Sequence, residues 1–100
     1  MPYNRAMQKE SKKPLEISSM LKVVTGELIL KAWAWLGVIA HPENNEMHVD
    51  LKQAKLAIDA LEKLLEIKNE FLNKKEIRET EASLSNLKLN YVSKLNEKNK

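Results

Sequence analysis

The chain has 100 residues, a length that suits one small domain. It contains no cysteine, which excludes disulfide bonds and thiolate chemistry and fits a reducing compartment such as the cytoplasm. The net charge of +3 comes from the two ends, because residues 1–14 carry +3, residues 94–100 carry +2 and the body between them sums to −2. A mildly acidic body is a poor surface for phosphates, which argues against nucleic acid as the main partner.

A first helix is predicted over residues 15–36, after a basic tail at residues 1–14 that has no apolar periodicity and is expected to be mobile. Gly37 suits the position just after the helix end, where a left-handed conformation is common. This helix is apolar on nearly all sides, and Trp33 and Trp35 point to nearly opposite sides of it. A helix without a polar face is buried in protein or lies in a membrane.

A membrane span is not expected, although residues 20–40 have the necessary length. Lys22, Glu27 and Lys31 would each cost about 2.5–3.5 kcal/mol near the bilayer centre, whereas each apolar residue returns only about 0.3–0.6 kcal/mol. The charge-free run at residues 32–40 is nine residues long, which is too short to cross a bilayer. No signal peptide is expected either, because the apolar run begins late. The sequence therefore predicts a soluble, cytoplasmic protein.

A second helix is predicted from Asp50, which would cap its N-terminus together with Gln53, to about residue 70. Its apolar residues spread over roughly 220° of the helical wheel. An arc this wide must contact two neighbouring helices. On the narrow polar side, Lys55 and Asp59 are four residues apart and can form an ion pair.

A third helix is predicted over residues 74–95, after a capping box formed by Asn73 and Glu76. Its apolar residues lie within about 80° of the helical wheel, so it should bury one side and expose the other. The joint with the preceding helix is short, which forces an antiparallel hairpin. Residues 96–100 are expected to form a basic C-terminal tail, leaving a single helical domain at residues 15–95.

The sequence thus predicts an all-α, three-helix chain in which the hairpin of the second and third helices covers one side of the first. The other side must be covered by another copy or another protein. A symmetric dimer, assembled as a helical bundle through the first helix, is the simplest solution because two-fold contacts are self-complementary. The residues expected in this interface are Leu21, Val24, Leu28, Ile29, Ala32, Trp33, Trp35 and Leu36.

The connector between the first two helices contains the main cluster of residues able to bind a metal. These residues are His41, Glu43, Glu46, His48 and Asp50. Two histidines and a carboxylate are a known ligand set, but the spacing lacks the i, i+4 register of a helical site, and a solvated polar loop is the alternative. No metal or cofactor site is assigned. Ser83 and Ser85 have no histidine nearby in sequence, so no nucleophile–base pair is indicated and no enzyme is expected.

Three functions are consistent with this pattern. The first is a non-enzymatic module that oligomerises through its first helix. The second is an adaptor that receives a helix from another protein along its first or second helix. The third is a nucleic-acid-associated protein that binds through its basic tails.

Four short motifs follow one another in the middle of the chain. They are Leu36-Gly37, Pro42-Glu43, Val49-Asp50-Leu51 and Ile58-Asp59-Ala60-Leu61. In this order they resemble the bacterial family called domain of unknown function 1844, and the likeness covers roughly residues 20–95. The chain departs from the family pattern at His41 and at residues 69–71, where a glycine is common in the family. The motifs are turns, caps and core positions, so the resemblance implies a helical fold and brings no catalytic residue.

Overall fold

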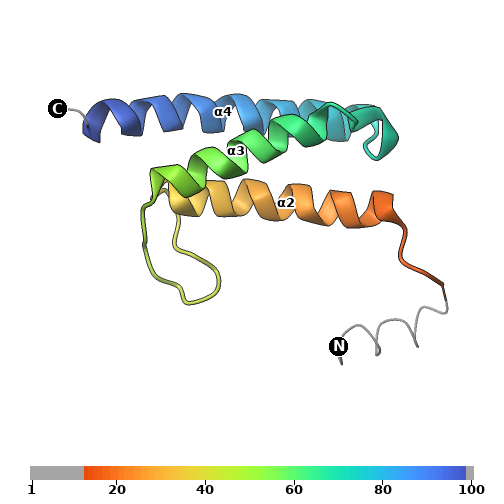
Figure 1. Cartoon of the computed structure of the whole chain (residues 1–100), viewed down its shortest axis with the longest axis horizontal. Coiled ribbons are helices and arrows are strands. Elements are labelled where there is room, and N and C mark those ends of the chain that lie inside the picture. Colours follow the sequence, from red (N-terminus) through yellow and green to blue (C-terminus); the bar gives the residue numbers. More distant parts are fainter. Residues whose placement is uncertain (1–12, 99–100) are drawn as a thin grey trace.

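The computed structural model describes residues 13–98, which fold into three α-helices and one short 3₁₀ helix (Figure 1). These elements are α2 (Ile17–Trp35), α3 (Leu51–Leu65), η1 (Lys68–Glu70) and α4 (Lys74–Lys98). Within residues 13–98 the only β-structure is an isolated bridge between His41 and Glu46. The predicted all-α, three-helix fold is confirmed. Most of the predicted N-terminal tail and residues 99–100 lie outside the described part, and so does much of the basic charge on which the nucleic-acid alternative depends.

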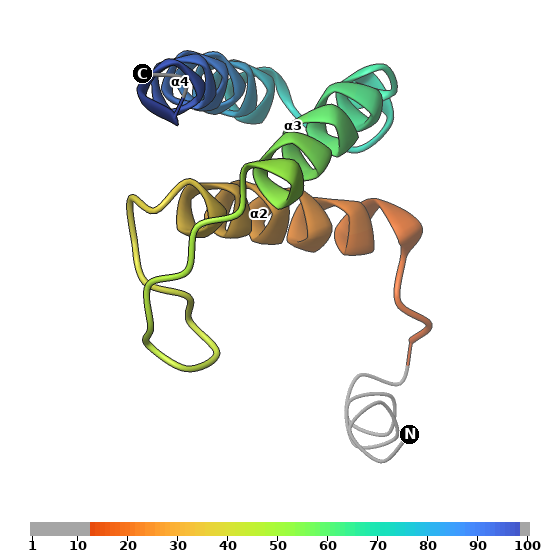
Figure 2. The same ribbon diagram turned by 60° about the vertical axis from the view of Figure 1, so that its left-hand side comes forward.

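Helix α3 is the central element of the fold. It packs against α2 on one side and α4 on the other, whereas α2 and α4 contact each other little. Figure 2 shows α3 crossing α2 obliquely before the chain turns back into α4. This arrangement confirms that the wide apolar arc of α3 contacts two helices. Its buried residues are Ala54, Ala57, Ile58 and Leu61, which join Ala32, Leu36, Leu84 and Leu87 in one core.

The C-terminal ends of α3 and α4 differ from the predicted boundaries. Helix α3 ends at Leu65 instead of residue 70, and η1 follows after a turn. A continued α-helix would project Phe71 about 80° away from Leu61 around the helix axis. The turn instead leaves Phe71 only 5% exposed. Helix α4 continues to Lys98, so residues 96–98 belong to the helix instead of the predicted C-terminal tail, as suits residues such as Glu97 that favour helix.

The start of α3 is capped from one direction only. The Asp50 carboxylate accepts hydrogen bonds from the backbone N–H groups of Lys52 and Gln53 at 3.0 and 3.2 Å, as predicted. The reciprocal bond from the Asp50 N–H to the Gln53 side chain does not form, because that N–H donates to the Trp35 carbonyl at 3.0 Å. The amide therefore joins the end of α2 to the start of α3.

The capping box at the start of α4 forms in full and makes the stability of the helix depend on pH. The Asn73 N–H donates to the Glu76 carboxylate, and the Glu76 N–H donates to the Asn73 side-chain oxygen, both at 2.8 Å. The hydrogen bond from Asn73 lowers the pKa of Glu76 below its ordinary value of 4.5, and Lys22 lowers it further. A carboxyl group of this kind stabilises the fold above its unfolded pKa, and that contribution is lost as the pH falls through the folded value.

We therefore expect Glu76→Gln to lower the melting temperature at neutral pH, because the charged acceptor at the cap is lost. The difference between variant and wild type should shrink as the pH falls below 4.5, where Glu76 of the wild type also becomes neutral. Thermal unfolding followed by circular dichroism at a series of pH values measures this difference. A difference that stays constant with pH would count against the contribution of this carboxylate.

The two glycines are expected to respond to alanine in opposite ways. Gly37 has a φ of +84°, as predicted for the end of α2, and an added Cβ would lie 2.6 Å from Cγ2 of Val49. Gly26 lies within α2, and an added Cβ there would have no neighbour within 4 Å. We expect Gly37→Ala to lower the free energy of unfolding by about 1–2 kcal/mol and Gly26→Ala to raise it by about 0.5–1 kcal/mol. Urea unfolding of both variants checks this, and changes of the same sign would disprove it.

Candidate functional site

Over residues 17–30, the side of α2 that faces away from the core is not covered by the part of the chain that the structure describes, whereas Ala34 near the end of the helix is fully buried. Five of its apolar residues are exposed: Ile17, Met20, Val23, Val24 and Leu30. Their exposed fractions run from 38% to 66%. The helical wheel places them over an arc of about 140° opposite the α3-facing side. The hairpin therefore covers one side of α2, and the other side remains accessible over residues 17–30, where Glu27 interrupts an otherwise largely apolar surface.

The eight residues predicted for a dimer interface fall into three groups in the single chain. Ala32 and Leu36 are fully buried in the chain's own core, so they have no surface left for a second copy. Val24 is 44% exposed. The remaining residues, Leu21, Leu28, Ile29, Trp33 and Trp35, are half-buried. The predicted set is therefore centred too close to α3, and only part of it borders the uncovered side.

An apolar groove lies between α2 and α3. It contains a hollow of about 220 Å³. The residues that line it are Leu28, Lys31 and Trp35 of α2 and Gln53, Leu56, Ala57 and Ala60 of α3. Leu56 borders the hollow and is 63% exposed. A groove between two helices with apolar walls is the kind of surface that receives an apolar side chain or one face of a helix.

The connector fixes the aromatic end of this groove. The imidazole of His41 contacts the indole of Trp35 edge-on, with 4.2 Å between the ring centroids. The Lys31 ammonium lies 5.3 Å from the centre of the same indole and 2.6 Å from Nδ1 of His41. On its other side, Nε2 of His41 lies 2.9 Å from the backbone carbonyl oxygen of His48. An ammonium only donates and a carbonyl only accepts, so His41 is a neutral imidazole with its proton on Nε2.

The predicted alternative of a solvated loop is wrong for His41, which is 4% exposed. The other candidate metal ligands of the connector are exposed, and residues 13–98 contain no group of three potential ligands arranged to hold a metal. Lys31 also donates to both carboxylate oxygens of Glu43 at 2.8 Å, and these bonds lower the pKa of Glu43. The connector therefore packs against the end of α2 through His41 and Glu43. The one sequence signal for it is the position of His41 directly after the apolar run at residues 32–40.

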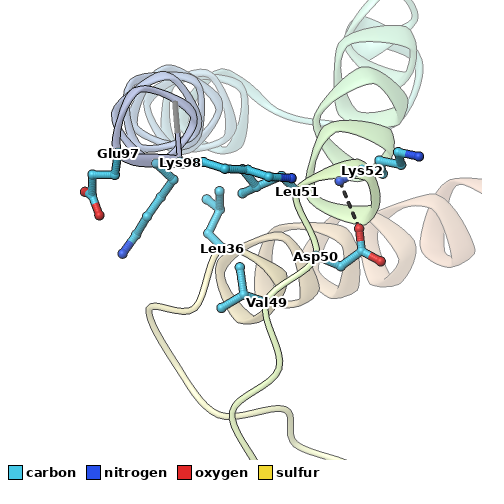
Figure 3. A pocket seen from close by; sticks show the side chains of 8 residues that line it. Leu36, Val49, Asp50, Leu51, Lys52, Glu97 and Lys98 are labelled. Atoms are coloured by element: carbon cyan, nitrogen blue, oxygen red, sulfur yellow. Dashed lines mark hydrogen bonds between the residues drawn. The ribbon is translucent and has the colours of Figure 1, made fainter. Parts of the chain in front are cut away.

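A larger hollow, of about 750 Å³, opens where α4 ends beside the junction of α2 and α3. The residues that line it are Leu36, Val49, Asp50, Leu51, Lys52, Lys94, Glu97 and Lys98. Figure 3 shows Glu97 and Lys98 on α4, across the hollow from Asp50 and Lys52. The carboxylate of Asp50 is occupied by amides of α3. Because ammonium and carboxylate groups are mixed around an apolar floor, this hollow indicates no particular class of ligand.

Within residues 13–98, every helix is too short or too polar to span a lipid bilayer. No curated protein and no solved structure shows significant similarity to the chain. The model of one family, described as a domain of unknown function (DUF1844), matches residues 19–93. This match includes the exposed side of α2 apart from Ile17, the connector and both walls of the groove. Because it spans most of the sequence, the chain belongs to the DUF1844 family.

Proposed function

We propose that this protein is a non-enzymatic, cytoplasmic helical module that self-associates through α2. The observation that carries this proposal is the uncovered apolar side of that helix, on which Val23 remains 64% exposed and Val24 44% exposed. Contiguous exposed apolar residues of this kind mark interaction surfaces in small proteins. The groove beside them extends the accessible apolar surface from α2 onto α3.

The exposed apolar residues of α2 and the groove together provide enough surface for a dimer of moderate affinity. Fully burying an aliphatic side chain is worth about 1.5–3 kcal/mol, and the exposed apolar residues of α2 are on average about half exposed. Covering all five residues in both copies of the dimer is therefore worth on the order of 10 kcal/mol. Association itself costs an estimated 4–15 kcal/mol. These terms are similar in size, so the contacts of the groove must supply the net affinity, and we expect micromolar dissociation.

The ionisable groups support a role without catalysis. Both ring nitrogens of the buried His41 are occupied, one by Lys31 and the other by a carbonyl oxygen, so the ring is not free to take a proton from a substrate. Among residues 13–98, three surface groups have shifted pKa values, and each shift is caused mainly by a hydrogen bond to one neighbour: the pKa is lowered for the exposed Glu43 and the partly exposed Glu76 and raised for the exposed Lys55. Exposed pairs of this kind are typical of a solvated surface.

Light scattering coupled to size-exclusion chromatography tests the proposal on the full chain. At tens of micromolar we expect a mass of twice the chain mass of 11.5 kDa. We expect Val24→Asp to reduce the mass to that of a single chain, because a carboxylate would be buried in the contact. The matched control is Val92→Asp on α4, where the valine is 53% exposed, and this variant should keep the dimer mass. A wild-type mass of 11.5 kDa at every concentration would overturn the proposal.

A second candidate function is an adaptor that receives a helix from another protein. The groove favours this candidate because it presents Leu28 and Trp35 from one helix and Leu56 from the other. The adaptor requires that the groove be free in the purified protein. The same light-scattering experiment separates the two functions, since an adaptor with a free groove is a monomer whose mass does not change in Val24→Asp.

A further inference from the structure

The α2–α3 groove presents an exposed apolar side chain beside a hollow that is itself largely apolar. Leu56 is 63% exposed and borders the hollow of about 220 Å³. An apolar cavity of about 150 Å³ accepts a benzene ring, so this hollow has room for a leucine side chain. A surface that carries both features is complementary to itself, which is the requirement for a two-fold contact between identical chains.

Exposed charges of opposite sign flank the groove on its two helices. Glu27 is on the exposed side of α2, between Val24 and Lys31, and within residues 13–98 it has no hydrogen bond or ion pair. Lys63 lies on α3, seven residues after Leu56 and so on the same face. Its side chain is 80% exposed and pairs with the exposed carboxylate of Glu66, just after the end of α3, at 3.4 Å.

From these features we propose that two copies pair face to face through their α2–α3 grooves. A two-fold axis along the groove places α2 of each copy on α3 of the other. Leu56 of one copy then enters the hollow of the second copy, and Glu27 of one copy faces Lys63 of the second, each contact occurring twice. This inference rests on the proposed self-association and adds the surface, the orientation and the residues that determine it.

A charge-exchange experiment tests this pairing in the full chain. Dissociation constants are measured by sedimentation equilibrium for the wild type, Glu27→Lys, Lys63→Glu and the double variant. Each single substitution places like charges together twice, so we expect about tenfold weaker dimerisation. The double variant restores opposite charges and should return to within about threefold of the wild type. If the dissociation constant of the double variant rises by the product of the two single increases, the proposed Glu27–Lys63 pairing is overturned.

The hydrophobic contact is tested with a matched pair of substitutions. Leu56→Asp should abolish the dimer, whereas Leu89→Asp on α4, where the leucine is 69% exposed, should leave its dissociation constant unchanged. Both side chains lie at the surface, and circular dichroism confirms that each variant is folded. A wild-type dimer that is insensitive to Leu56→Asp and to both charge reversals would refute this interface and leave self-association standing. A monomeric wild type would refute both.

Discussion

Replacing Leu61 by alanine is expected to lower the free energy of unfolding by about 2–5 kcal/mol. Leu61 is 1% exposed and belongs to the core shared by all three helices. Of the three helices in residues 13–98, α3 alone packs extensively against both of the others. A cavity at this position therefore weakens both helix pairs at once. Small domains have total stabilities of about 5–15 kcal/mol, so a loss of this size removes a large fraction of the stability.

Leu89→Ala on α4 is the matched control, because this leucine is 69% exposed and makes no contribution to the core. The control should change the free energy of unfolding by less than about 0.5 kcal/mol. Urea unfolding followed by circular dichroism measures both variants under the same conditions. Equal effects for the two leucines would show that the core does not lie where the fold places it.

The second large effect is expected for His41→Ala, which should lower the free energy of unfolding by about 2–3 kcal/mol. The substitution leaves a cavity beside Trp35 and removes one partner of the Lys31 ammonium, which keeps Glu43, and the side-chain partner of the His48 carbonyl oxygen. It should also loosen the connector over the end of α2. We therefore expect the tryptophan fluorescence of the native state to move to longer wavelength as Trp35 becomes more exposed.

His48→Ala provides the comparison within the same connector. The side chain of His48 is 57% exposed, and its one hydrogen bond within the described residues is to the exposed Glu46. This variant keeps the backbone carbonyl that His41 uses, so stability and fluorescence should stay close to those of the wild type. If the two histidine variants had the same stability and fluorescence, the stabilising contact of His41 with Trp35 would be disproved.

The elements with a one-sided pattern and a local cap were predictable from the sequence. The start of α4 follows from Asn73 and Glu76, whose side chains can satisfy each other's amides without any tertiary contact. Thr80, Leu84 and Leu87 of α4 are all buried, and they lie on one side of the helix, as the narrow apolar arc of residues 74–95 predicts. The contact of α3 with two helices follows in the same way, since the width of an apolar arc limits how many neighbours a helix needs.

The features that depend on tertiary contacts were not predictable. A helix that is apolar nearly all round does not encode the direction from which its neighbour approaches, so Ala32 and Leu36 were assigned to an external interface although both are buried in the core. The residue at which α3 ends depends on the burial of Phe71, and the apolar periodicity of α3 does not predict that burial. The burial of His41 likewise arises from its contact with Trp35, six residues earlier in the chain.

Isotope-filtered nuclear Overhauser spectroscopy tests most directly whether a second copy covers α2. The sample is an equal mixture of carbon-13-labelled and unlabelled full-length chains at a concentration where the dimer is populated. We predict cross-peaks between copies that join the methyl groups of Val24 and Leu28 to those of Leu56 and Ala60. A spectrum without any cross-peaks between copies, from a sample that tumbles as a single 11.5-kDa chain, would contradict the coverage of α2 by a second copy.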